Sequence, residues 1–182
     1  MKVEEAASAR YARALFEAAK KAGALDKVHE DLRELVGVFI QSGLKKYLEN
    51  PRFSFESKRR VVLKVAEKLR SPLSAGFLLV LLKKLRISHL FSVARAYEAL
   101  LYEHKNIVIA DVTLAGKPNA AFDDAIRHSL EKITRKKVIV SYKTNPDIIG
   151  GIFIKMGDRV IDASVSSKLK DLRKQLLETR LN

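Results

Sequence analysis

The hydrophobic pattern changes at Asn106, and no other feature of the sequence restricts the fold as strongly. Before Asn106, apolar residues recur every three or four positions, which places them on one face of a helix. After it, short runs rich in Val and Ile alternate with turn residues, as strands and their connections do. The sequence therefore predicts an α+β fold, mostly α, with a helical bundle over 1–105 and a small α/β domain over 106–182.

The first part contains six predicted helices, separated by residues that end or begin helices. Gly23 and Gly43 follow the first and second helices, and Asn50 before Pro51 ends the short third one. Pro72 opens the fifth helix, because its missing N–H has no partner at the first helical position. Ser88 is the predicted N-cap of the sixth helix. Short connections between six helices indicate a compact bundle of roughly antiparallel neighbours.

The second part is predicted to run β-α-β-β-β-α, a short sheet with helices on one face. Asn119 is placed to cap the first helix of this part, and a final helix begins at about Ser166. Gly157 and Asp158 form a tight hairpin turn, because Gly adopts the positive φ such turns need. The predicted strands are 107–114, 138–142, 148–155 and the stretch around 160–161.

Composition sets limits on the class of protein. The formal net charge is +14, and the excess is spread over both parts of the chain. A charge of this size favours acidic proteins, anionic lipid surfaces or nucleic acid as partners, without choosing among them. The absence of Cys excludes disulfides and thiolate chemistry. The longest apolar run, 77–82, is far shorter than the ~20 residues of a membrane span, and the first residues lack the pattern of a leader. We therefore expect cytosolic exposure and no membrane span.

No group of residues predicts catalysis, a cofactor or a metal. The histidines lie far apart in the sequence, whereas metal ligands need close neighbours. Gly150 and Gly151 run into a predicted strand and not into the helix that a phosphate-binding loop requires. Close approach of the backbone, or a bulge in the sheet, explains them better. The four histidines are His29, His89, His104 and His128.

Two basic runs, 58–60 and 135–137, keep a different function open. Phosphate binding needs clustered Lys and Arg, and binders of single strands usually add exposed aromatic side chains. Both runs lie beside apolar periodic positions and few aromatic residues, so a solvated basic face is favoured. A basic nucleic-acid or ribosome-associated protein remains the alternative, and selective nanomolar binding of RNA would support it. An enzyme on the α/β domain is a second alternative, which a convergent buried polar pocket would support.

The segment 138–172 resembles the C-terminal signature of the ATP synthase delta subunit family, also called the oligomycin-sensitivity-conferring protein. Its sequence reads VIVSYKTNPDIIGGIFIKMGDRVIDASVSSKLKDL, a long match with fixed spacing. Segments 9–16 and 77–87 resemble the first and fifth helices of the same family. The net charge exceeds what we expect of this family, and its role is unexplained. The signature residues include Gly150, Gly151, Gly157, Asp158, Asp162 and Ser164.

The resemblance implies a non-catalytic stator subunit on the cytoplasmic face of the bacterial inner membrane, with no cofactor and no nucleic acid. Such a subunit joins the catalytic head to the peripheral stalk. Helices one and five are then expected to form a groove for the N-terminal helix of an alpha subunit. The groove residues are Tyr11, Ala14, Leu15, Ala18, Phe77, Val80, Leu81 and Lys84.

The α/β domain is expected, on the same resemblance, to bind the C-terminal ends of the stalk b subunits. The apolar face of the last helix is the first candidate surface, with Ile154 and Val160 nearby. Basic residues on that helix, such as Lys168, Lys170 and Arg173, are expected to attract acidic stalk helices. The stalk-binding candidates are Leu169, Leu172 and Leu176.

Overall fold

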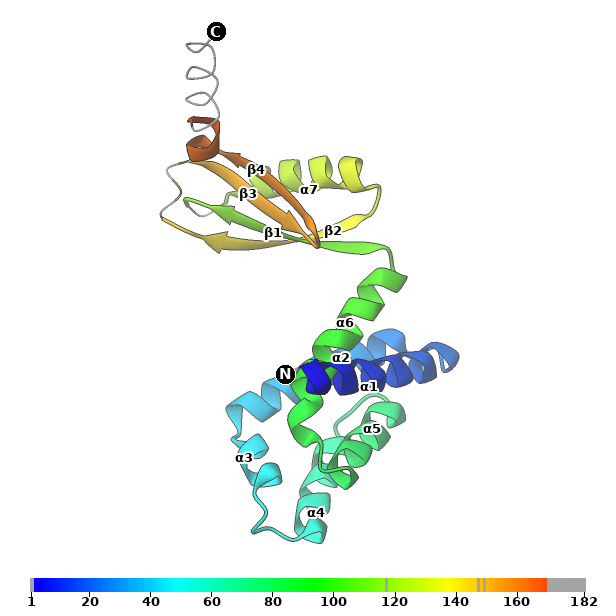
Figure 1. Cartoon of the computed structure of the whole chain (residues 1–182). Coiled ribbons are helices and arrows are strands. Elements are labelled where there is room, and N and C mark those ends of the chain that lie inside the picture. The colour runs from blue at the N-terminus through cyan, green and yellow to red at the C-terminus, as the bar shows by residue number, and fades with distance from the viewer. Residues whose placement is uncertain (1, 117, 147, 149, 170–182) are drawn as a thin grey trace. The chain divides into compact units, whose positions relative to one another are not determined.

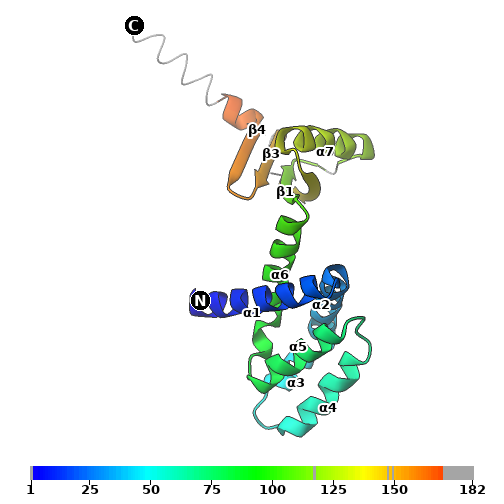
Figure 2. The same ribbon diagram turned by 90° about the vertical axis from the view of Figure 1, so that its right-hand side faces the viewer.

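The computed structural model describes residues 2–116, 118–146, 148 and 150–169 (Figures 1 and 2). The chain divides into two compact units, which we call the helical unit (Met1–Tyr102) and the sheet unit (Glu103–Asn182). The predicted boundary after residue 105 falls just past this division. The chain is mostly helical with one small sheet, so the predicted α+β fold class is confirmed.

The helical unit contains the expected succession of helices, and none of the helices in the described ranges has the length and apolarity needed to cross a membrane. Pro72 is the first residue of α5, as predicted. Ser88 is not the N-cap of α6, because it lies inside a short 3₁₀ turn and α6 begins two residues later. The elements are α1 (Lys2–Lys21), α2 (Leu25–Gln41), α3 (Leu44–Glu49), α4 (Phe55–Ala66), α5 (Pro72–Lys83), η1 (Ile87–His89) and α6 (Leu90–His104).

Tyr97 on α6 lies at the centre of the core of the helical unit and joins three helices. Its ring packs edge-on against that of Phe16 on α1, with 5.7 Å between centroids. Its hydroxyl donates a hydrogen bond to the carbonyl oxygen of Leu25 on α2 at 3.1 Å. Burial of the hydroxyl raises the pKa of Tyr97, so the phenol stays neutral and keeps its donor. Other large, fully buried side chains of the same core are Phe39, Leu32, Leu35, Leu78, Leu81, Leu82 and Leu90.

Asp31 on α2 fixes the start of α5. Its side chain is fully buried, and its two carboxylate oxygens accept hydrogen bonds from the backbone N–H groups of Arg70 and Ser71, both at 2.9 Å. Ser71 is the N-cap of α5, and its hydroxyl oxygen accepts a bond from the N–H of Leu73. A buried charge is tolerated when hydrogen bonds satisfy it. This carboxylate therefore binds the α4–α5 connection to α2.

Leu85 follows α5 in an unusual conformation. Its φ is +54°, the left-handed region that glycine normally occupies after a helix. The N–H of Arg86 donates to the carbonyl oxygen of Leu81 at 2.8 Å, which closes the end of the helix. The side chain of Leu85 is 81% exposed, so it makes too little buried contact to offset the strain of this backbone conformation.

Replacing Leu85 with glycine is therefore expected to stabilise the helical unit. A side chain in the left-handed conformation costs about 1 kcal/mol relative to glycine, and little buried apolar contact is lost. We expect a gain of about 1 kcal/mol in the free energy of unfolding, measured by urea denaturation. Leu85→Ala keeps the strain and is the control. Equal stabilisation by both substitutions would contradict the backbone explanation.

The sheet unit has four strands in the order β2-β1-β3-β4. β1 lies between β2, with which it is parallel, and β3, with which it is antiparallel. The parallel pair is connected through α7, and β3 and β4 form a hairpin. The elements are β1 (Ile107–Leu114), α7 (Ala120–Thr134), β2 (Lys137–Thr144), β3 (Gly151–Met156) and β4 (Arg159–Ser164).

α7 covers one face of this sheet. Asn119 caps the helix as predicted, since its side-chain oxygen accepts from the N–H of Phe122 at 2.8 Å. The hydroxyl of Tyr142 on β2 donates to Asp123 on α7 at 2.6 Å, and burial together with this bond raises the pKa of Tyr142 to about 12. The buried residues between helix and sheet are Ala110, Val112, Leu114, Leu130, Val138, Ile154 and Met156.

Glycines shape the β3–β4 hairpin and its entry. Met156 pairs with Arg159, so Gly157 and Asp158 form a two-residue loop, and Gly157 has a φ of +56°. The predicted third strand begins later than expected, at Gly151, whose φ of +87° is unsuited to a regular strand with a side chain. A Cβ on Gly151 would lie 2.3 Å from the carbonyl oxygen of Ala163 on β4. Only glycine allows this close approach of two backbones.

Candidate functional site

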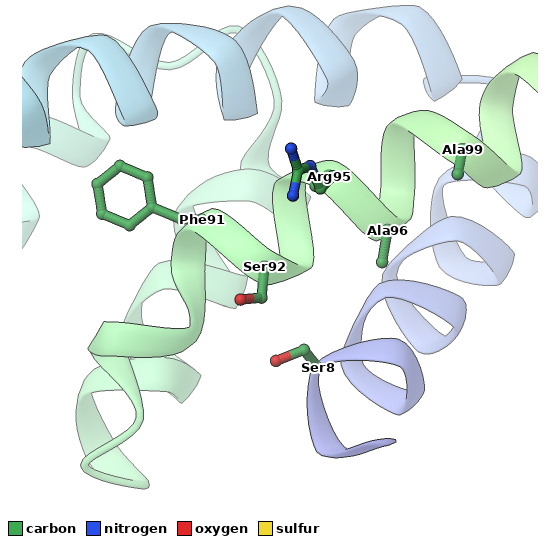
Figure 3. Close-up of a pocket in the computed structure, with 6 residues that line it drawn as sticks. All are labelled: Ser8, Phe91, Ser92, Arg95, Ala96 and Ala99. Carbon is green, nitrogen blue, oxygen red and sulfur yellow. The ribbon is translucent and has the colours of Figure 1, made fainter. Parts of the chain in front are cut away.

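A cavity between α1 and α6 has no arrangement suited to catalysis. It measures about 540 Å³ and opens between Ser8 on α1 and one side of α6 (Figure 3). Alanine and serine side chains dominate its lining, and the guanidinium of Arg95 points away from α1. An active site needs several polar groups that converge on one point. The α6 side chains that line the cavity are Phe91, Ser92, Arg95, Ala96 and Ala99.

Two histidines of the helical unit contact polar side chains of other helices. Nδ1 of His89 lies 2.9 Å from the hydroxyl oxygen of Ser8, and Nε2 of His29 lies 3.7 Å from a carboxylate oxygen of Glu98. Within the part of the chain that the structure describes, no three His, Cys, Asp or Glu side chains come together in a way that would hold a metal ion. The best candidate for a functional site is therefore a surface, not a pocket.

α1 and α5 contact each other, and the eight predicted groove residues lie on these two helices and on Lys84, the residue that follows α5. Leu15 and Leu81 are buried in the core and support the surface from beneath, and Phe77 is also buried. Tyr11 and Ala18 are half-buried. The exposed members are Ala14, Val80 and Lys84. The outward surface is thus narrower than the sequence predicted.

Tyr11 is held in place from two sides. Its ring meets the ring of Phe77 on α5 edge to face, with 6.4 Å between centroids. The guanidinium of Arg86 lies over the ring, 5.6 Å from its centroid, and donates weakly to the phenol oxygen at 3.4 Å. A cation above an aromatic face is attracted by the ring electrons. Tyr11 therefore presents a fixed aromatic edge beside exposed basic groups.

Several residues of this surface were missed by the sequence prediction. Gly76 lies one helical turn before Val80 on the exposed side of α5, where it leaves the backbone open to close approach. Leu85 adds an exposed apolar side chain at the end of the helix, and Arg86 holds Tyr11. The four-residue spacing of Gly76 and Val80 was a usable signal. The conformation of Leu85 was not visible in the sequence.

We give the name α1/α5 surface to three residues of α1, two residues of α5 and the three residues that follow α5. Three exposed cations follow Val80 closely along the chain, namely Lys83, Lys84 and Arg86. On α1, Arg10 and Arg13 border a shallow cavity of about 360 Å³ that also contains Glu17. The members of the α1/α5 surface are Tyr11, Ala14, Ala18, Gly76, Val80, Lys84, Leu85 and Arg86.

The first basic run does not form a continuous basic face. Lys58 is buried, with 6% of its surface exposed, whereas Arg59 is exposed and pairs with Glu56 at 3.6 Å. The second run, 135–137, is exposed at the end of α7 and the start of β2. Only this second run resembles the clustered cations that phosphate binding requires.

The signature residues of the sheet unit form a structural junction. The carboxylate of Asp162 accepts hydrogen bonds from the N–H of Ser164 at 2.9 Å and from the hydroxyl of Ser167 at 2.6 Å. The hydroxyl oxygen of Ser164 accepts from the N–H of Ser167 at 3.3 Å, which caps the helix seen at 165–169. The carbonyl oxygen of Gly150 accepts from the N–H of Val165 at 3.0 Å. These contacts connect the hairpin to the helix.

The stalk-binding candidates and the residues near them differ in how much of each side chain is exposed. Leu169 is 57% exposed, while Leu172 and Leu176 lie outside the described residues. Ile154 is only 3% exposed and packs against α7, so the sheet needs it for its own core. Val160 on β4 is 53% exposed.

Comparisons with known proteins agree over nearly the whole chain. Residues 7–176 match the family described as ATP synthase delta (OSCP) subunit. The ATP synthase subunit delta of Desulfosudis oleivorans is 36% identical over 169 residues, covering 92% of each chain. That of Bradyrhizobium diazoefficiens is 35% identical over 173 residues, covering 94% of this chain and 93% of the relative.

The fold is also found in a solved structure. A chain in the cryo-EM structure of the Toxoplasma gondii mitochondrial ATP synthase hexamer superposes with a TM-score of 0.74 at 24% sequence identity. The match covers 93% of this chain and 97% of that one. From the family match and the identity to its bacterial members, the chain belongs to the ATP synthase delta (OSCP) subunit family, a structural and non-catalytic part of the ATP synthase.

Proposed function

We propose that this chain is a stator subunit that joins the catalytic head of an F-type ATP synthase to its peripheral stalk. A rotor produces useful torque on the head only if the head is prevented from turning with it. The connector must therefore bind firmly at two places and needs no bond chemistry of its own. Two compact units, each with its own core, suit a connector of this kind.

One observation carries the proposal for the helical unit. The α1/α5 surface presents exposed small and apolar residues on a rigid, fully packed base, with cations around them. Val80 is 45% exposed and Leu85 is 81% exposed. Phe77 and Leu81, on the same helix as Val80, are buried in the core. Exposed apolar groups on a well-packed unit commonly mark a protein interface.

The chemistry of this surface fits the N-terminal helix of an alpha subunit, provided that this helix is amphipathic. Such a helix lays its apolar stripe into a groove and is anchored at a few positions. Ala14 and Gly76 allow its backbone to approach closely, and Tyr11 offers an aromatic anchor of the kind that dominates interface energies. Lys84 and Arg86 favour acidic residues on the rim of the partner helix.

The sheet unit is proposed to bind the b subunits of the peripheral stalk. The two attachments together place the chain at the cytoplasmic face of the bacterial inner membrane, as a peripheral part of the complex. Selective nanomolar RNA binding through the exposed run 135–137 would instead favour the nucleic-acid alternative.

Binding of a synthetic alpha-subunit N-terminal peptide by full-length protein tests the helical unit. We expect Val80→Asp to weaken binding at least tenfold, because a carboxylate replaces an exposed apolar contact on the α1/α5 surface. Ile40→Asp is the matched control, since Ile40 is 68% exposed at the end of α2 and lies off this surface. Isothermal titration calorimetry gives the affinities, and circular dichroism verifies folding. Equal affinities of the two variants would exclude the α1/α5 surface as the binding site.

A further inference from the structure

Cations from two segments of the sheet unit that are distant in the sequence meet at one end of its sheet. The register of the parallel pair places Ile107, at the start of β1, beside Lys137, at the start of β2. β3 runs antiparallel to β1, so the β3–β4 hairpin lies at this same end. Figure 1 shows the α7–β2 connection and the hairpin at the end of the sheet where β1 begins. The fold therefore brings the basic run 135–137 and the basic residue of the hairpin to one place.

A cavity of about 380 Å³ opens between this connection and the hairpin. Val108 and Met156 give it apolar surface, and Ala110 and Ile154, two positions away on the same strands, are buried against α7. The cavity therefore lies on the α7 side of the sheet. Arg159 points to this side as well, because it pairs with Met156. We call it the basic cavity, and its lining residues are Val108, Thr134, Lys136, Met156, Asp158 and Arg159.

Hydrogen bonds within the α7–β2 connection fix its backbone and do not use its basic side chains. The N–H of Arg135 donates to the carbonyl oxygen of Glu131 at 2.8 Å and ends α7. The hydroxyl of Thr134 donates to the carbonyl oxygen of Leu130 at 2.8 Å, and its oxygen accepts from the N–H of Lys136 at 3.3 Å. A binding site benefits when its groups are positioned before the ligand arrives. The turn thus holds the backbone of Lys136 at the wall of the cavity.

The cations of the basic cavity lack counterions within the protein. Lys136 and Arg159 are exposed, and no residue in the described ranges forms an ion pair with either side chain. Arg135 and Lys137, the neighbours of Lys136, are exposed as well. Asp158 is the one acidic residue of the described lining. Cations gathered at one place repel one another, and a bound anion relieves this repulsion.

We propose that the basic cavity binds a small anion that carries a phosphate group, a site separate from both attachments of the stator function. An Arg guanidinium donates two parallel hydrogen bonds to phosphate oxygens, and a Lys ammonium adds a compact charge. Arg159 supplies the first from the hairpin, and Lys136 supplies the second from the α7–β2 connection. Val108 and Met156 offer apolar surface to the body of an organic phosphate. The volume falls within the range of about 300–1,000 Å³ that is usual for small-molecule sites.

A nucleic-acid strand fits this cavity less well than a small anion does. Proteins that bind single strands usually stack successive bases on aromatic side chains, whereas the described lining of the basic cavity contains no aromatic residue. Phosphates along a strand require cations spread along its path, and the cations here gather around one cavity. These observations favour one phosphate-bearing molecule over a chain of phosphates.

Isothermal titration calorimetry of the full-length protein with pyrophosphate, and with ATP in the absence of Mg²⁺, tests the proposal. We expect both anions to bind, and ATP to bind more tightly because its base and ribose reach the apolar surface. Arg159→Gln and Lys136→Gln are each expected to weaken binding about tenfold, since each removes a charge-assisted hydrogen bond. Lys155→Gln is the matched control, because Lys155 is exposed on β3 and points to the face opposite Met156. Circular dichroism verifies that all variants are folded.

Substitution of the acidic lining residue is expected to have the opposite effect. Asp158→Asn should strengthen binding of pyrophosphate about threefold, because a carboxylate at the cavity no longer repels the anion. Asparagine suits this turn position as aspartate does. Asp124→Asn makes the same change in net charge at an exposed position in the first half of α7, and is expected to leave the affinity unchanged. Equal effects of the two substitutions would overturn the proposal, because net charge alone would then govern binding.

The remaining outcomes would also overturn the proposal, and none of them depends on binding of the head or the stalk. The first is failure of the unaltered protein to bind either anion. The second is an equal loss in Arg159→Gln and Lys155→Gln, since binding would then follow the net charge of +14. Single-stranded RNA that binds much more tightly than ATP, and is lost in Arg159→Gln and Lys136→Gln, would assign the cavity to nucleic acid. Binding only to vesicles that contain phosphatidylglycerol would assign it to a membrane surface.

Discussion

Replacing Gly151 with alanine is expected to destabilise the sheet unit strongly and to leave the stability of the helical unit unchanged. Gly151 has a φ of +87°, which L-residues rarely adopt, and a Cβ there would lie 2.3 Å from the carbonyl oxygen of Ala163 and 2.8 Å from Cα of Ser164. Both atoms belong to the backbone of β4, which cannot move without breaking the β3–β4 register. Strain of this kind and loss of pairing together cost about 3 kcal/mol or more, against a total stability of about 5 kcal/mol for a unit of this size.

Hydrogen exchange followed by mass spectrometry measures the two units separately in one protein. We expect peptides of the sheet unit to lose protection in Gly151→Ala, while peptides of the helical unit keep it. Gly116→Ala is the control, because a Cβ at Gly116 meets nothing within 4 Å and its φ lies in the ordinary range. Similar protection of the sheet unit in both variants would show that the close approach at Gly151 is not required.

Asp31→Ala is expected to destabilise the helical unit by about 3 kcal/mol. The carboxylate accepts two backbone N–H groups at 2.9 Å in a fully buried position, and each bond to a charged acceptor contributes about 1.5–3 kcal/mol. Its removal leaves both donors without an acceptor just before α5. In a unit of about 100 residues, this loss lowers the melting temperature by about 10–20 °C.

Substitutions at Asp31 and Glu34 distinguish the buried hydrogen bonds from the exposed ion pairs as the cause of this loss of stability. Glu34 also contacts Arg70, at 2.8 Å, but its side chain is 46% exposed. Glu34→Ala is therefore expected to change the free energy of unfolding by less than about 1 kcal/mol. Asp31→Asn keeps one acceptor oxygen and should lie between the other two variants. If thermal melts give Asp31→Ala and Glu34→Ala the same loss, the surface ion pairs and not the buried bonds fix the start of α5.

Most of the fold could be predicted because it depends on local signals. Pro72 and Asn119 act at the first turn of their own helices, and the Gly157 turn needs only two residues. The prediction of Ser88 as a cap was wrong because the preceding residues enter a left-handed conformation and then a 3₁₀ turn. Nothing in the local sequence shows that Leu85 takes a position suited to glycine.

The exposed face of each element was harder to predict than the element itself. The family resemblance placed Leu81 and Val80 together on the expected groove, yet one is fully buried and the other is 45% exposed. A one-residue step along a helix turns a side chain by about 100°, so only the packing partners decide which side is core. The same difficulty applies to the sheet unit, because the sequence does not show which face of a sheet α7 covers.

The contacts of Asp31 and Gly151 depend on distant parts of the chain. Asp31 binds backbone groups about forty residues later in the sequence, and the space beside Gly151 is filled by β4. Asp31 looks unremarkable within its own segment, whereas the glycine pair at 150–151 predicted a close approach of the backbone without showing that β4 is the partner. Long-range contacts of this kind emerge only when the elements are packed together.

The central position of β1 has a consequence for how the protein is made. β1 is the first strand of the sheet unit to leave the ribosome, yet its two partners, β2 and β3, end only at Thr144 and Met156. During translation, its apolar residues remain without a sheet until about forty more residues have been synthesised, counted from Leu114 to Met156. The helical unit depends on helices that are complete well before this point, so it is free to fold first. Synthesis of the sheet unit is thus the stage at which the nascent chain is most exposed to aggregation.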